Sequence, residues 1–85
     1  MPQLDATVEK ICRHITDADL QPGDQLPSEA DLVTMTGASR WIVREALRML
    51  DTLGVVQIHR GRRTVVGNDA SKMEYFSSVL TSVFE

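Results

Sequence analysis

The stretch that decides the fold is residues 26–63, LPSEADLVTMTGASRWIVREALRMLDTLGVVQIHRGRR. It combines a short helix pattern, a glycine break, a second helix pattern with an arginine at every fourth position, and a basic turn. From Arg40 to Arg63 six arginines stand against two acids, a local charge of +4, whereas the remaining residues sum to −7 in a chain of net charge −3. A positive region on an otherwise acidic chain indicates a polyanion site, and DNA is the usual polyanion.

Upstream of this stretch, apolar residues from Leu4 to Ile15 recur at spacings of three and four. This period predicts a helix over about residues 4–18 with one buried face. The sequence QPGD at residues 21–24 predicts a turn, because proline fixes φ and glycine permits positive φ. Residues 25–26 are expected to form a very short strand.

Two helices are predicted inside the deciding stretch. Ser28 is a good N-cap for a short helix over residues 29–34, with Asp31 in the position of a capping box. Ser39 is the predicted N-cap of the next helix, over residues 40–52. The apolar stripe of that helix consists of Val43, Ala46, Leu47 and Leu50.

A β-hairpin is predicted after these helices. Residues 55–58 and 64–66 favour strands, and Arg60–Arg63 favours a tight turn between them. Three helices followed by a hairpin is the order of a winged helix-turn-helix, so the expected fold class is α+β. We expect one DNA-binding domain over residues 1–67, followed by a linker and a last amphipathic helix that starts near Ser71.

The helix with the repeated arginines has the features of a DNA-reading helix. Arg40, Arg44 and Arg48 lie on the face opposite its apolar stripe. The major groove admits such a helix, so Arg40 and Arg44 are predicted to read guanine or contact phosphate closely. Ser39 and the N–H groups of the helix start suit a phosphate oxygen. For Arg48 we expect a phosphate contact or an intramolecular ion pair.

The basic turn has the composition of a wing. Gly61 lets the backbone approach a groove wall, and the flanking arginines are predicted to enter the minor groove, where the potential is most negative. His59 is expected either to add a contact or to have a structural role, and Trp41 to pack on a sugar or on the wing. The candidate DNA contacts are Ser28, Ser39, Arg40, Trp41, Arg44, Arg48, His59, Arg60, Gly61, Arg62 and Arg63.

Each basic feature also has an ordinary explanation. A helix with arginine at i, i+4 and i+8 is usually a solvated face, and Ser-Arg after glycine is a common capped helix start. The occurrence of all the features in wing order favours DNA binding. The alternative function is a protein-interaction module whose basic face meets an acidic partner.

Other classes of chemistry have little support in the sequence. Cys12 is the single cysteine, so an internal disulfide is excluded, and the sequence Cys12-Arg13-His14 lacks the second cluster that a zinc site requires. No nucleotide-binding glycine motif and no positioned catalytic triad is found. We therefore expect neither an enzyme nor a cofactor. With no signal peptide and no apolar run of about 20 residues, we expect a cytoplasmic, nucleoid-associated protein without a membrane contact.

The sequences LPSEADL, GASRWIVREALRMLDTLGVV and HRGRRTVV together resemble the N-terminal domain of the GntR family of bacterial transcription regulators. The resemblance covers about residues 4–67 and is closest to the FadR-like subfamily. It implies homodimers on palindromic operators, controlled by a small-molecule effector bound to a C-terminal domain. It places Ser39, Arg40 and Arg44 in the recognition helix, and Arg60 and Gly61 in the wing.

The chain departs from the family pattern at several positions. Ala30 stands where FadR-like members often have arginine, Arg63 replaces the second wing glycine, and Val65 stands where an aromatic residue is common. Residues 68–85 resemble a linker and the first helix of a missing or truncated effector and dimerisation domain. Alternatively, this last helix pairs with its twofold mate in a dimer.

Overall fold

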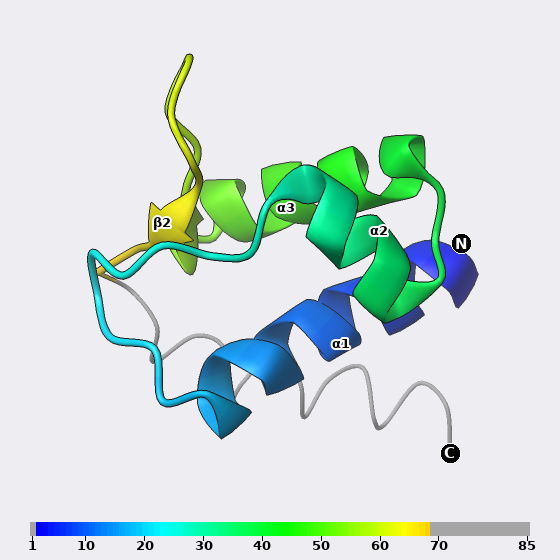
Figure 1. Ribbon diagram of the computed structural model, residues 1–85, viewed down its shortest axis with the longest axis horizontal. Helices are drawn as coiled ribbons and strands as arrows, with labels where there is room; N and C mark the ends of the chain where they lie inside the picture. Colours follow the sequence, from blue (N-terminus) through cyan, green and yellow to red (C-terminus); the bar gives the residue numbers. More distant parts are fainter. Residues whose placement is uncertain (1, 69–85) are drawn as a thin grey trace.

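The computed structural model describes residues 2–68. In this part of the chain, three helices precede a two-stranded antiparallel sheet (Figure 1), which confirms the predicted winged helix. The elements are α1 (Pro2–Asp17), α2 (Glu29–Thr36), α3 (Arg40–Thr52), β1 (Val56–Gln57) and β2 (Val65–Val66). The predicted helix near Ser71 and the domain boundary after residue 67 lie at or outside the edge of the described residues.

Helix α1 begins two residues earlier than the apolar period indicates. Its first residue is Pro2, a residue type that the first helical position accommodates because the N–H there has no helical partner. The helix ends at Asp17, and Asp19 has a positive φ of 52° in the turn that follows. The buried face of α1 consists of Thr7, Val8, Ile11, Cys12 and Ile15.

Helix α2 is two residues longer than predicted, because its end is set by Gly37 and by Thr36. Gly37 has a φ of 73° and donates its N–H to the carbonyl of Val33 at 3.0 Å. The Thr36 hydroxyl donates to the carbonyl of Leu32 at 2.7 Å and accepts from the N–H of Ala38 at 3.2 Å. A threonine that bonds the carbonyl four residues back is compatible with the last helical turn.

Helix α3 follows the predicted bounds. The Ser39 side chain accepts from the N–H of Ile42 at 3.2 Å, which is the expected N-cap bond. Ile42 is buried as well, although the predicted stripe omitted it. Gly54 follows the helix with a φ of 82° and donates its N–H to the carbonyl of Asp51.

The hairpin strands are shorter than predicted. Val56 pairs with Val66 and Gln57 with Val65, so each strand has two residues. The predicted strand at residues 25–26 is a single antiparallel bridge between Gln25 and Val65, which places β2 between β1 and the segment before α2. This third segment anchors the wing on the side away from β1.

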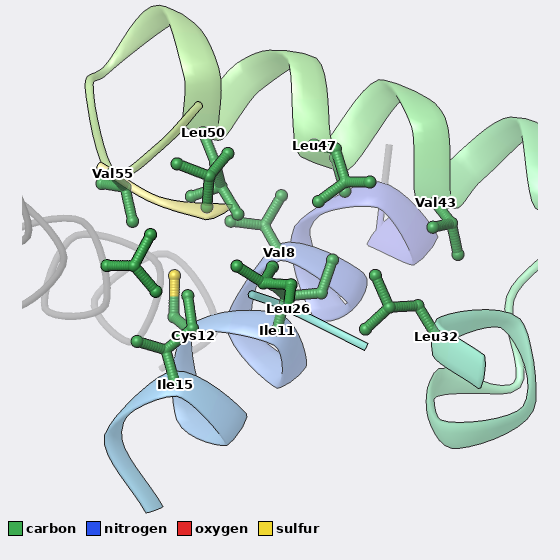
Figure 2. Packing of buried hydrophobic residues seen from close by; sticks show 13 residues of the cluster. Val8, Ile11, Cys12, Ile15, Leu26, Leu32, Val43, Leu47, Leu50 and Val55 are labelled. Atoms are coloured by element: carbon green, nitrogen blue, oxygen red, sulfur yellow. The ribbon is translucent and has the colours of Figure 1, made fainter. Parts of the chain in front are cut away.

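One hydrophobic cluster connects all the elements (Figure 2). Helix α1 packs mainly against the apolar face of α3, and Leu32 from α2 and Leu26 from the preceding segment close the cluster. Val55, Val56 and Val66 attach the base of the hairpin to the same core. Since the apolar face of α3 is covered in this way, its arginine face points outward. Within residues 2–68, no helix has both the length and the apolar character needed to cross a bilayer.

Candidate nucleic-acid interface

A groove of about 540 Å³ runs between the outer face of α3, the start of α2 and the hairpin. Four arginines and one glutamate line it, so the formal charge of these side chains is positive. The lining residues are Pro27, Ser28, Glu29, Arg44, Leu47, Arg48, Ile58, His59, Gly61, Arg62, Arg63 and Thr64. The groove therefore brings arginines of the helix and arginines of the hairpin to the same side of the molecule.

The α3 arginines are solvent-exposed, as the sequence predicts. Their side chains keep 64% exposure at Arg40, 56% at Arg44 and 69% at Arg48. Trp41 is also exposed, at 58%. Arg44 and Arg48 line the groove, whereas Ser39, Arg40 and Trp41 lie at the start of α3 outside its lining.

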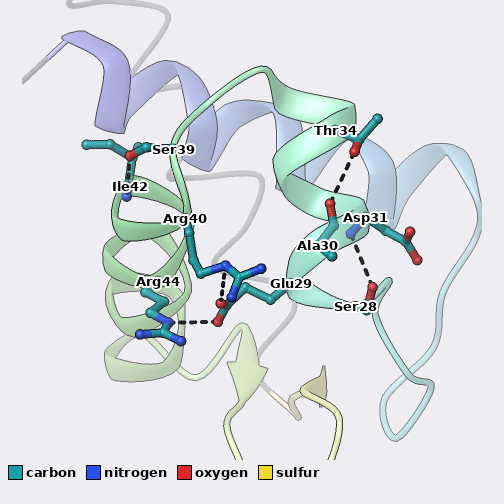
Figure 3. Close-up of polar contacts among 9 residues, drawn as sticks. All are labelled: Ser28, Glu29, Ala30, Asp31, Thr34, Ser39, Arg40, Ile42 and Arg44. Carbon is teal, nitrogen blue, oxygen red and sulfur yellow. Dashed lines mark hydrogen bonds and ion pairs between the residues drawn. The ribbon is translucent and has the colours of Figure 1, made fainter.

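An acidic residue that sequence reasoning missed lies between two of these arginines (Figure 3). One carboxylate oxygen of Glu29 is 3.3 Å from Nε of Arg40, and the other accepts a hydrogen bond from Nε of Arg44 at 2.9 Å. The hydrogen bond to Glu29, together with the attraction of its charge, raises the pKa of Arg44 above its ordinary value. Glu29 is the first residue of α2, so no local spacing in the sequence relates it to Arg40 or Arg44.

The third arginine of α3 has its own partner. Arg48 donates from Nη1 to Glu45 at 2.8 Å, three residues earlier on the same helix. This intramolecular pair is one of the two outcomes that the sequence predicts for Arg48. Because both side chains keep substantial exposure, the pair is weak and open to exchange.

Both predicted serine caps are formed. The Ser28 hydroxyl oxygen accepts from the N–H of Asp31 at 3.1 Å, and the Ser39 oxygen accepts from Ile42 (Figure 3). Each hydroxyl hydrogen can still be donated to an external acceptor such as a phosphate oxygen. Ser28 lies in the groove lining and Ser39 at the exposed start of α3.

The hairpin turn extends away from the helices (Figure 1). His59 and residues 60–63 are all exposed, and Gly61 has a φ of 72°, a backbone conformation that glycine adopts without strain. Of the turn residues, Gly61, Arg62 and Arg63 line the groove, whereas Arg60 does not. Ile58, which the sequence assigned to a strand, lies just beyond β1 and presents an exposed apolar side chain to the groove.

Cys12 is buried in the core and does not line the groove. Burial in the core, with a smaller contribution from the charge of Glu9, raises the pKa of Cys12 to about 11. The thiol is therefore protonated and unreactive at neutral pH. Within residues 2–68, no group of three or more histidine, cysteine or acidic side chains is arranged to hold a metal ion.

Comparison with known proteins identifies a family. Residues 4–66 match the profile described as bacterial regulatory proteins, gntR family. The chain is 37% identical over 73 residues to the uncharacterized HTH-type transcriptional regulator YcbG of Bacillus subtilis (strain 168), covering 86% of this chain and 31% of that protein. It is 36% identical over 77 residues to the mannosyl-D-glycerate transport/metabolism system repressor MngR of Escherichia coli (strain K12), covering 91% of this chain and 31% of MngR. The chain thus spans under a third of the length of these relatives.

Solved structures show the same fold. The chain is similar to Streptococcus agalactiae GntR with a TM-score of 0.73 and 25% identity, over 76% of this chain and 32% of that one. It is also similar to S. agalactiae BusR in complex with its busAB-promotor DNA, with a TM-score of 0.75 and 18% identity, over 94% of this chain and 39% of BusR. These likenesses agree with the three helices and the hairpin described above.

Proposed function

Because this chain belongs to the gntR family of bacterial regulatory proteins, we propose that it binds double-stranded DNA sequence-specifically, with α3 in the major groove and the hairpin wing at the minor groove. The observation that carries the proposal is the positive groove between α3 and the wing. A duplex that enters it meets arginines from two separate elements at once. Regulation of transcription, rather than catalysis, is the activity of the family.

Each candidate residue has a role in this proposal. Arg44 and Arg40, near the N-terminus of α3, read base edges or contact phosphate closely, since their guanidinium groups can donate two parallel hydrogen bonds to guanine. Arg48 contacts phosphate after exchanging its partner Glu45. The serine caps Ser28 and Ser39 donate their hydroxyl hydrogens to phosphate oxygens.

The wing completes the contact set. Arg62 and Arg63 extend from the groove towards the minor groove, Arg60 meets the backbone at the outer edge, and Gly61 permits a close approach. His59 adds a polar contact at the root of the turn. Trp41, exposed at the start of α3, packs on a deoxyribose next to the reading helix.

The proposed biological unit is a cytoplasmic, nucleoid-associated homodimer on a palindromic operator. Two copies related by a twofold axis present two α3 helices to successive major grooves, and operator symmetry then mirrors protein symmetry. We propose that residues 1–67 form the DNA-binding domain and that residues 68–85 lead towards a FadR-like effector and dimerisation domain. The greater length of the relatives supports this division.

Selection of bound duplexes from a random pool tests the proposed function. The expected result is an enriched inverted repeat whose half-sites are about one helical turn apart. Enrichment of a single unrepeated site would contradict the dimer, and absence of any enrichment would contradict sequence-specific binding. Binding to an acidic protein but to no duplex would instead favour the interaction-module alternative.

A further inference from the structure

Glu29 stands out among the acidic residues because it contacts two arginines of another helix. Its two carboxylate oxygens are divided between Arg40 and Arg44 (Figure 3). The other ion pairs in residues 2–68, Arg13 with Glu9 and Arg48 with Glu45, join neighbours within one helix. Glu29 instead bridges the start of α2 to the start of α3, over fifteen residues of sequence in the case of Arg44.

The geometry of the bridge leaves the reading end of Arg44 available. The hydrogen bond to Glu29 uses only the Nε–H of the guanidinium group. The two terminal nitrogens can therefore still donate hydrogen bonds to another acceptor. Guanine recognition needs two parallel donors presented at a fixed angle. An arginine held through Nε retains fewer orientations than a free one, so less freedom is lost when it binds a base.

The carboxylate of Glu29 also disfavours sequence-independent contacts between these arginines and phosphate groups. A phosphate that approaches Arg40 or Arg44 must either displace Glu29 or lie next to its negative charge. A base edge carries no net charge, so the repulsion that it meets from Glu29 is weaker than that met by a phosphate. Glu29 therefore favours base contacts over phosphate contacts at these two arginines.

We propose that Glu29 is a specificity-determining positioning residue, which orients Arg40 and Arg44 for base readout and disfavours their binding to random phosphates. The proposal rests on the proposed DNA-binding function and adds a role for an acidic side chain within a basic surface. It assigns the start of α2, outside the recognition helix, to the discrimination between sequences.

Glu29→Gln in the full chain tests the proposal, because it removes the charge and keeps the side-chain size. Dissociation constants are measured for the duplex selected from the random pool and for a scrambled duplex of the same composition. We expect the variant to bind the scrambled duplex more tightly and the ratio of the two constants to fall about three- to tenfold, the range that two exposed ion pairs provide. Thermal unfolding checks that the fold is retained.

Glu45→Gln is the matched control. It removes the same charge from a similarly exposed glutamate that pairs with one groove arginine, Arg48. We expect it to tighten binding to both duplexes equally, so that the ratio stays within about twofold of the wild type. If Glu29→Gln behaves in the same way as Glu45→Gln, Glu29 contributes only net charge and the proposal is wrong.

A second measurement separates this proposal from the proposed function. In the free protein, the Nε–H signal of Arg44 in nitrogen–proton NMR spectra is expected to shift on Glu29→Gln and to stay unchanged on Glu45→Gln. An unchanged signal in both variants would overturn the positioning role whether or not DNA binds. A wild-type protein that shows no preference between the two duplexes would instead overturn the proposed function, and with it the role in specificity.

Discussion

At the residue scale, the six arginines from Arg40 to Arg63 occupy different electrostatic environments. Arg40 and Arg44 share Glu29, and Arg48 pairs with Glu45. In the described part of the chain, the three arginines of the turn have no acidic partner within 4.0 Å. The arginines of the turn can therefore bind a phosphate without first leaving an acidic partner. The arginines of α3 bind a phosphate either after leaving their glutamate or with that glutamate still beside them. This difference is consistent with the proposed division of roles, in which the wing contacts phosphates and α3 reads bases.

Arg44→Ala is expected to weaken binding to the selected duplex about tenfold to a hundredfold, and binding to a scrambled duplex much less. The loss of a bidentate base contact of ~1–3 kcal/mol accounts for this difference. Fluorescence anisotropy with both duplexes measures it.

Arg13→Ala is the control for Arg44→Ala. Arg13 is also a largely exposed arginine with a glutamate partner, but it lies on α1 and outside the groove. Its replacement should leave both affinities unchanged. Equal losses of affinity for the two duplexes on Arg44→Ala would reassign Arg44 to a phosphate contact.

The pH dependence of stability depends on Cys12. Its pKa is raised from 9.0 to about 11 in the folded protein, chiefly by burial. As pH rises, the thiol of the unfolded chain loses its proton before the thiol of the folded protein does. The free energy of unfolding is therefore independent of this group below pH 9, and it falls as pH rises towards 11. The free energy of unfolding should fall by up to about 2–3 kcal/mol over this range.

Urea unfolding at several pH values measures this effect, and Cys12→Ala identifies its source. The variant should start from a lower stability, because it leaves a small cavity, but should lose less stability between pH 9 and 11 than the wild type. Parallel curves for the two proteins would show that other groups cause the loss.

At the scale of elements, the start of α3 combines a structural cap with a proposed phosphate contact. Ser39→Ala should lower the free energy of unfolding by about 1 kcal/mol, because the N–H of Ile42 loses its acceptor. Ser39→Asp restores an acceptor and should keep the stability, yet it places a negative charge where DNA is proposed to lie. Thermal unfolding and duplex titration of both variants separate the two roles; unchanged DNA affinity for Ser39→Asp would remove the phosphate contact.

The wing is fixed to α3 through its backbone. Gly67, after β2, donates its N–H to the carbonyl of Val55 at 2.8 Å and packs directly against the carbonyl of Gly54. A side chain at residue 67 would collide with that carbonyl, so only glycine permits this approach. On the other side, Leu26 donates its N–H to the carbonyl of Thr64. The angle between the wing and α3 is thus set by backbone contacts at the root of the hairpin.

At the scale of the whole molecule, charge is segregated. Helix α1 runs along the side away from the hairpin tip (Figure 1), whereas the groove between α3 and the wing is lined by four arginines. Since the whole chain has a net charge of −3, the positive charge of this groove contrasts with the acidic balance of the rest of the sequence.

Binding should therefore depend steeply on salt. If Arg48, Arg62 and Arg63 each neutralise a phosphate, log K should fall with log[salt] with a slope of about −3 per protomer, and Arg62→Ala should reduce the slope by about 0.9. Titrations between low and moderate salt measure the slopes, with Arg13→Ala as the unchanged reference. An affinity that is independent of salt would contradict the electrostatic account.

The sequence by itself determined the elements and the identity of the basic residues. Helix limits at Ser28, Ser39 and Gly37 depend on capping and on positive φ, which act within a few residues, and apolar spacing indicates the buried face of each helix. The order of three helices and a hairpin followed from these local signals. The pairing of Arg48 with an acid was also foreseeable, because Glu45 is three residues away on the same helix.

Only the tertiary structure decided what these residues contact. The distance from Glu29 to Arg40 and Arg44 depends on how α2 packs against α3, and the bridge between residues 25 and 65 joins segments that are far apart in the chain. Ile42 is buried as well, which the apolar stripe of a single helix does not reveal. Such contacts join residues distant in the chain, so their geometry follows from the assembled core, whereas caps and apolar periods are local.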